Sequence, residues 1–264
     1  MKKILILGHN GMLGNAVYKY FSTKKEKYNL STIDDRWGST TFSEKIKTLD
    51  VEIIINCIGI IPQKKPTEDD YKKVNIDLPI FLETSGGKII HPSTDCEFKG
   101  DISNDKKYSK TSERDADDLY GKSKADISKL IEETFKNTKI IRTSIIGHEK
   151  GTSIALLDWF LNSTEKVGGY TNHYWNGITT LEWAKQCESL IENWDNSPVL
   201  NQFGTNDINS KYELLKLIKK IYDKDIKINP VEASIYTNKC LESDKEVIDL
   251  EQQLLELKEF YKKV

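Results

Sequence analysis

The chain opens on the stretch Ile4-Leu5-Ile6-Leu7-Gly8-His9-Asn10-Gly11-Met12-Leu13-Gly14. An apolar run that fits a short strand leads straight into three glycines and then into a segment with helical spacing. In such a strand-turn-helix unit the first glycine permits the tight turn, the second lets a pyrophosphate approach the backbone, and the third lets helix and strand pack closely. The helix N-terminus also favours anionic phosphates. The stretch therefore predicts dinucleotide binding, with candidate contacts at Gly8, Asn10, Gly11, Met12, Leu13 and Gly14.

Further apolar runs in the first half of the chain alternate with segments of helical spacing. The runs cover residues 30–33, 51–55, 88–90 and 139–141. Short apolar runs separated by helical patterns are typical of parallel strands joined by crossover helices. The chain is therefore predicted to adopt an α/β fold with a doubly wound parallel sheet of the Rossmann type, which binds ligands beyond the carboxyl ends of its strands.

Beyond about residue 145 the alternation weakens and aromatic residues gather, among them Trp159, Tyr170 and Trp175. We expect residues 1–145 to form the dinucleotide-binding domain and residues 146–264 to form a smaller α+β substrate-binding lobe interleaved with it. The last segment begins with a capping-box pattern at Ser243-Asp244-Lys245-Glu246 and continues with apolar spacing for a helix of about five turns. This helix is expected to dock on its own chain, with a homodimer contact as the alternative.

Composition excludes several classes of protein. The 264 residues carry 39 basic and 41 acidic side chains, so no basic excess points to a nucleic-acid polymer as partner. No apolar run approaches the roughly 20 residues of a membrane-spanning helix, and the start is too short for a signal peptide. The four cysteines show no Cys-x-x-Cys spacing. We therefore expect a cytoplasmic globular protein without disulfides.

Charged side chains follow the second predicted strand as Asp34-Asp35-Arg36. A carboxylate at this place would bind the adenosine ribose of NAD, whereas an arginine would pair with the 2′-phosphate of NADP. Charged residues that only face solvent, without binding a cofactor, would give the same sequence pattern. The pattern leaves the choice between the two cofactors open.

Polar residues also follow the fourth and fifth predicted strands. His91-Pro92-Ser93-Thr94-Asp95-Cys96 places hydroxyls at one strand end, and Arg142-Thr143-Ser144 follows the next. Tyr120 and Lys124 lie four residues apart, hence on one face of a helix. A neighbouring cation stabilises a phenolate, so we expect Lys124 to lower the pKa of Tyr120 and make it an effective proton donor.

Together these motifs resemble the extended short-chain dehydrogenase/reductase superfamily. Within it, residues 93–100, 119–124 and 142–144 resemble the dTDP-4-dehydrorhamnose reductase family of sugar-nucleotide enzymes. The likeness covers most of residues 1–185, including Asn56, Asn75 and Gly177-Ile178-Thr179-Thr180.

The resemblance implies Thr94, Tyr120 and Lys124 as the catalytic trio and NADP(H) or NAD(H) as the cofactor. It implies that a reduced nicotinamide delivers hydride to the C4 carbonyl of a nucleotide-linked 4-keto-6-deoxy sugar, a precursor of surface polysaccharide, and that no metal takes part. Cys57, Gly59 and Asn75 would join the glycine turn, residues 34–36, Tyr120 and Lys124 around the cofactor. The implied substrate-binding residues are Ser93, Thr94, Asp95, Cys96, Arg142 and Trp175.

Two other functions remain open. Cys96 falls where the related GDP-fucose synthases carry a catalytic cysteine, and with His148 or His173 it could form an acid/base pair for epimerisation. Some relatives are regulatory subunits that bind the cofactor without turnover. The sequence does not specify the nucleotide, the stereochemistry of the sugar or the oligomeric state.

Overall fold

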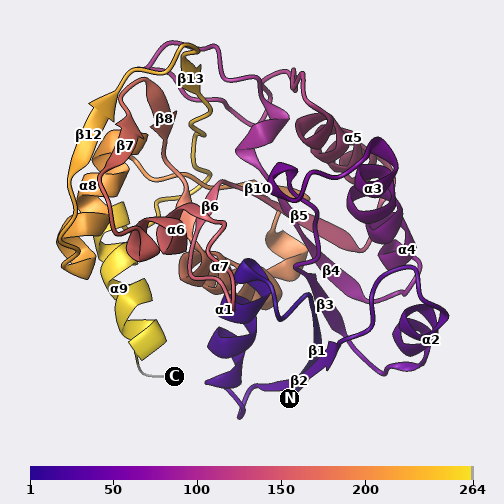
Figure 1. The fold of residues 1–264 in the computed structure, drawn as a ribbon. Helices are drawn as coiled ribbons and strands as arrows, with labels where there is room; N and C mark the ends of the chain where they lie inside the picture. Colours follow the sequence, from indigo (N-terminus) through magenta and orange to yellow (C-terminus); the bar gives the residue numbers. More distant parts are fainter. Residues whose placement is uncertain (263–264) are drawn as a thin grey trace.

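The fold is built on one six-stranded parallel sheet, seen in a computed structural model that describes residues 1–262 (Figure 1). The strand order is β10-β5-β4-β3-β1-β2. The five predicted strands are confirmed, and the sixth, β10, was missed because it has only three residues, two of them amides. The strands are β1 (Lys2–Leu7), β2 (Tyr28–Ile33), β3 (Ile53–Asn56), β4 (Lys88–Ser93), β5 (Thr138–Arg142) and β10 (Leu200–Gln202).

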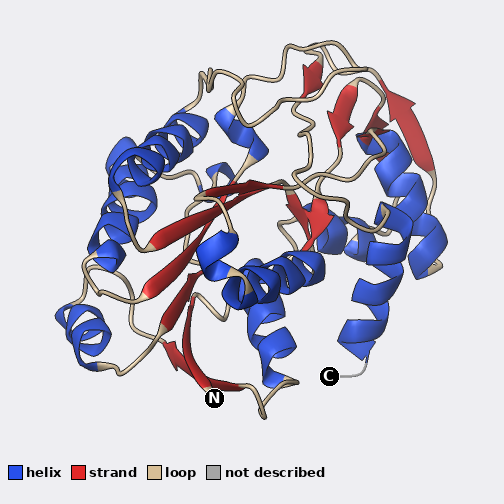
Figure 2. Ribbon diagram, turned by 180° about the vertical axis from the view of Figure 1, so that it is seen from behind, coloured by secondary structure: helices blue, strands red, loops and turns tan. Residues whose placement is uncertain are grey.

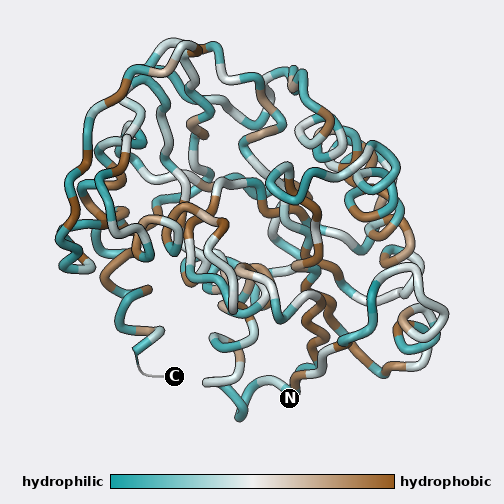
Figure 3. The backbone as a smooth tube through the Cα atoms, in the orientation of Figure 1, coloured by the Kyte–Doolittle hydropathy of each residue, from teal (hydrophilic) through white to brown (hydrophobic). Residues whose placement is uncertain are grey.

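Helices cover both faces of this sheet (Figure 2). Alternate residues of β1 enter two separate cores, because successive strand side chains point to opposite faces. Ile4 and Ile6 pack with the helices of one face, whereas Leu5 and Leu7 pack with those of the other. A sheet buried on both sides explains the continuous apolar runs, which also stand out along the central strands in Figure 3. The face that Ile4 and Ile6 enter is covered by α1 (Met12–Ser22) and α7 (Thr180–Glu192). The remaining helices of the first half of the chain are α2 (Thr40–Thr48), α3 (Glu68–Tyr71), α4 (Leu78–Glu83) and α5 (Leu119–Thr134).

A smaller second region packs beside the sheet around its own apolar core. Phe160, Leu214 and Leu254 belong to that core and come from three different helices. The two regions interleave, since α7 and β10 lie beyond residue 145 yet join the sheet layer. The elements of this region are α6 (Leu156–Asn162), α8 (Lys211–Tyr222), α9 (Leu250–Lys262), β6 (Ile145–Ile146), β7 (Val167–Tyr170), β8 (His173–Trp175), β9 (Ile178–Thr179), β11 (Asn209–Ser210), β12 (Ile228–Val231) and β13 (Thr237–Asn238).

The predicted start of the C-terminal helix at Ser243 is wrong. Helix α9 begins at Leu250, where the Asp249 carboxylate accepts a hydrogen bond from Gln252 N at 2.8 Å. The earlier segment is irregular and not helical, and Asp244 N donates to Gln202 O of β10 at 2.9 Å. As predicted, the helix docks on its own chain, with Leu254 and Leu257 fully buried. Within the described residues no helix has the length and apolar character needed to cross a bilayer.

Candidate active site

The glycine turn after β1 has the geometry that its sequence predicts. Gly8 has a φ of +75°, in the region that favours glycine, and an added Cβ would lie 3.0 Å from the Cys57 carbonyl. An added Cβ at Gly14 would lie 2.1 Å from Gly8 O, so α1 and the turn pack too closely for any side chain. Gly11, by contrast, faces more open space, its nearest contact being 3.4 Å away. The turn therefore presents an accessible backbone at the N-terminus of α1, which fits a pyrophosphate.

The three charged residues after β2 point to different partners. The Asp35 carboxylate accepts hydrogen bonds from Thr41 Oγ1 at 2.6 Å and from Lys45 Nζ at 2.5 Å, and these bonds lower its pKa. Asp34 instead lies 3.3 Å from Asn10 Nδ2 on the glycine turn. Arg36 is exposed. Asp35 is thus occupied by hydrogen bonds to residues of α2. Asp34 and Arg36 remain available to bind a ribose or a 2′-phosphate.

The loop after β3 is held by asparagine side chains. Asn75 is buried, and its amide bonds Ile60 N at 3.0 Å and Ile60 O at 3.2 Å. It also donates to Ser123 Oγ in α5 at 3.1 Å. These bonds place the backbone at Cys57 and Gly59 beside the glycine turn. The contribution of Asn75 to the site is therefore to position this loop, and direct contact of Cys57, Gly59 or Asn75 with a cofactor stays a prediction.

Thr94 and Tyr120 meet at the carboxyl end of the sheet. Thr94 follows β4, and its hydroxyl lies beside the Tyr120 phenol in the first turn of α5, close enough to act on the pKa of that phenol. Asp118 caps this helix by accepting a hydrogen bond from Gly121 N at 2.8 Å. An added Cβ at Gly121 would lie 2.2 Å from Cys96 O, so the helix start is pressed against the segment that carries Thr94. This packing fixes the phenol next to the hydroxyl.

Lys124 lies one turn further along α5 and is 4% exposed. Its ammonium donates to Pro92 O at 2.9 Å, and burial lowers its pKa to about 8. The expectation that Lys124 lowers the pKa of Tyr120 is wrong for this structure. Burial raises the pKa of Tyr120, with Cys96 and Asp95 adding to the effect and the neighbouring Thr94 hydroxyl opposing it. The ammonium is directed at the carbonyl, so the phenol stays protonated at neutral pH and can act as a proton donor.

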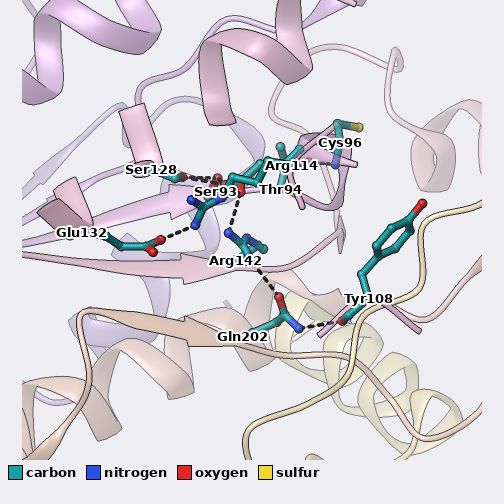
Figure 4. Close-up of polar contacts among 10 residues, drawn as sticks. Ser93, Thr94, Cys96, Tyr108, Arg114, Ser128, Glu132, Arg142 and Gln202 are labelled. Atoms are coloured by element: carbon teal, nitrogen blue, oxygen red, sulfur yellow. Dashed lines mark hydrogen bonds and ion pairs between the residues drawn. The ribbon is translucent and has the colours of Figure 1, made fainter. Parts of the chain in front are cut away.

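Ser93 and Arg142 belong to a buried ion-pair network beside this site (Figure 4). Glu97 is fully buried, and its carboxylate meets Arg142 Nη2 at 2.6 Å and Arg114 Nε at 2.7 Å. The hydroxyls of Ser93 and Ser128 donate to the same carboxylate, and Arg142 Nη1 donates to Gln202 Oε1 at 3.0 Å. The Ser93 hydroxyl and the two terminal nitrogens of Arg142 are thus engaged within the protein, whereas Arg142 Nε is buried without a hydrogen-bond partner among the described residues. Their contact with a substrate stays a prediction.

The cysteine-histidine pair considered for epimerisation is not formed. The Cys96 thiol lies 3.7 Å from Asp95 Oδ1, and burial raises its pKa to about 12. His148 is hydrogen-bonded to Asp158 at 2.7 Å and to Tyr222 at 3.0 Å, and His173 to Ile235 O at 2.9 Å. Both histidines therefore make these hydrogen bonds within the second region. The Cys96 thiol is not in its reactive ionised form at neutral pH.

Trp175 lines a cavity between the glycine turn and the second region. Its indole N–H donates to Ser144 Oγ at 2.8 Å, and its ring faces the cavity together with Met12 and Lys211. Sequence analysis did not identify Lys211. The available signal was a lysine at the first position of a helix marked by a capping box at Ser210 and Glu213.

Comparisons with known proteins agree with this architecture. Residues 1–258 match the family described as RmlD substrate binding domain. A dTDP-4-dehydrorhamnose reductase from Bacillus anthracis, solved in complex with NADP, is similar at 18% identity with 100% of each chain covered and a TM-score of 0.82. The corresponding enzyme from Clostridium acetobutylicum gives 18% identity, 98% and 99% coverage and a TM-score of 0.81.

A UDP-glucose 4-epimerase from Thermotoga maritima, solved with UDP-glucose, is also similar, at 17% identity with 99% of each chain covered and a TM-score of 0.78. No curated protein matches the chain by sequence. At these identities the solved structures establish the fold alone.

Proposed function

Since the chain belongs to the RmlD substrate binding domain family, we propose that it is an NAD(P)H-dependent reductase of a nucleotide-activated 4-keto-6-deoxy sugar. Such an enzyme would supply precursors for surface polysaccharide. The observation that carries the proposal is the Tyr120 phenol lying beside the Thr94 hydroxyl at the sheet edge that also holds the glycine turn. Similar proteins solved with NADP and with UDP-glucose support the cofactor and the substrate class.

The roles of the chain's own residues follow from the geometry. A reduced nicotinamide bound at the glycine turn would supply hydride. Tyr120, protonated at neutral pH, gives its proton to the substrate oxygen as negative charge develops there. Thr94 would turn its hydroxyl hydrogen, which Asp95 accepts in the free protein, toward the same oxygen and so stabilise that charge. Lys124, whose ammonium donates to Pro92 O in the free protein, would offer its ammonium to the ribose hydroxyls of the cofactor.

The direct test is turnover. Purified protein is incubated with NADPH or NADH and a panel of dTDP-, UDP- and GDP-linked 4-keto sugars, and the loss of reduced-cofactor absorbance is followed. We expect loss with at least one sugar and a 4-hydroxy product by NMR. The matched control is Tyr120→Phe, which should bind NADPH as wild type does but turn over far more slowly. Cofactor binding without turnover of any sugar, unchanged by Tyr120→Phe, would instead indicate a regulatory subunit.

A further inference from the structure

The cavity beside Trp175 contains a cation that the proposed chemistry does not use. The cavity measures about 80 Å³. Since roughly 10–15 Å³ of such space is enough to hold one water, the cavity has room for a small polar group such as a phosphate. Lys211 is the one charged side chain among the described residues that line it. The other walls include Met12, Ile146 and Leu214.

Lys211 lacks an anionic partner within residues 1–262. Its Nζ lies 5.4 Å from the centre of the Trp175 ring, a distance at which the ring face attracts a cation. Burial lowers the pKa of Lys211, whereas Asp95 and Cys96 raise it. These two residues directly follow Thr94, so the ammonium lies close to the catalytic segment. The Asp95 carboxylate itself accepts a hydrogen bond from Thr94 at 3.0 Å.

The position of Lys211 in α8 is electrostatically unfavourable for folding. It is the first residue of the helix, where the helix dipole disfavours a cation. The capping box already satisfies the helix start, because Ser210 and Glu213 exchange hydrogen bonds. A partly buried, unpaired cation at this place is thus not explained by stability. An anionic ligand group would relieve both the lost solvation and the missing charge partner.

On the basis of the function proposed above, we infer that Lys211 pairs with the diphosphate of the nucleotide-sugar substrate and orients the sugar toward Thr94 and Tyr120. The substrate class carries this group by definition, and the cavity has room for one phosphate. The net charge of −2 offers no general basic surface for it. Lys211 is therefore a binding residue for the diphosphate, separate from the glycine turn that serves the cofactor.

The experiment measures ligand binding by the full chain. Calorimetric titrations with dTDP, UDP and GDP, with the parent nucleosides, and with NADPH are made on wild type and Lys211→Met. Loss of a charge-assisted contact should weaken binding of the preferred nucleoside diphosphate by about tenfold or more. Nucleoside and NADPH affinities should not change, and Lys211→Arg should retain most of the diphosphate affinity.

Lys216→Met is the matched control. Lys216 lies on the same helix with its Nζ 5.4 Å from the centre of the Tyr212 ring, but it is exposed and outside the cavity. This variant should bind all ligands as wild type does. Equal nucleoside diphosphate affinity in Lys211→Met and wild type would overturn the inference, as would a loss confined to NADPH. A wild-type protein that binds NADPH but no nucleoside diphosphate, and reduces no sugar, would instead contradict the proposed function.

Discussion

Two polar clusters lie side by side at the carboxyl end of the sheet, and they differ in how completely their charges are paired. In the ion-pair network, the Glu97 carboxylate meets two arginines and two hydroxyls. In the candidate catalytic cluster, the Lys124 ammonium donates only to a backbone carbonyl, and the Tyr120 phenol lies beside the Thr94 hydroxyl. Neighbouring residues of one segment divide between them, Ser93 facing the network and Thr94 the site. Removing one partner of a paired buried charge destabilises the fold, whereas an unpaired buried charge is available for chemistry.

The largest expected effect belongs to the catalytic cluster. Replacing Tyr120 with Phe removes the proton donor but keeps the ring that packs 6.2 Å from Tyr71. Because general acid catalysis contributes about 10²–10⁴-fold, kcat should fall by that range while the melting temperature changes little. Steady-state reduction of the best sugar and thermal melting measure the two quantities. A variant that keeps more than half of wild-type kcat would show that the phenol is not the donor.

The opposite pattern is expected in the network. Replacing Glu97 with Leu leaves Arg142 and Arg114 without their buried counter-charge, and breaking such a pair costs about 3–5 kcal/mol of unfolding free energy. Denaturant unfolding of both proteins measures this loss. The control is Glu132→Ala, which removes a more exposed partner of Arg114 and should cost at most about 1 kcal/mol. Equal losses in the two variants would mean that burial does not distinguish the network.

The contrast also explains what the sequence could and could not predict. The apolar strands, the glycine turn and the Tyr120/Lys124 spacing are local patterns, so they were predictable from neighbouring residues. Glu97 lies within residues 93–100, but no local pattern marks it as a buried counter-charge. Its role as counter-charge to Arg142 depends on β4 and β5 lying side by side, which no local pattern encodes.

Other differences have the same origin. Strand β10 is short and polar, and it forms because β5 offers an open edge. Helix α9 starts late because Asp244 is held by β10. The pKa of Tyr120 depends on burial and on where the Lys124 ammonium points, and both are tertiary properties. Lys211 reaches the cavity because β11, which directly precedes α8, pairs with β8 beside Trp175.

The buried charge of Lys124 is expected to reduce the stability of the folded protein, and the size of this effect should depend on pH. The pKa of Lys124 in the folded protein is about 8, below the ordinary 10.5, so the folded state disfavours the charged form. Lys124→Met should therefore be more stable than wild type by up to about 3 kcal/mol at pH 7, although it loses activity. Below pH 8 both states are protonated and the full difference is present. As pH rises from 8 toward 10.5, the unfolded state binds more protons, so wild type gains stability and the difference disappears.

Denaturant unfolding of both proteins between pH 7 and pH 10.5 tests this. Lys129→Met, an exposed position on the same helix, is the control and should show no such pH dependence. If Lys124→Met is less stable than wild type across the whole range, Lys124 stabilises the fold, as the residues of the ion-pair network do.

The smallest effect is expected at Cys96, which lies between the two clusters. Its thiol has a pKa of about 12 and no histidine partner among residues 1–262. Cys96→Ser should therefore change kcat by less than about twofold, because a protonated thiol cannot serve as a base at neutral pH. Proton NMR of products formed in deuterated water should show no solvent deuterium at C3 or C5 of the sugar. Deuterium at either carbon that is absent with Cys96→Ser would show that Cys96 is a catalytic residue and that the enzyme is an epimerase.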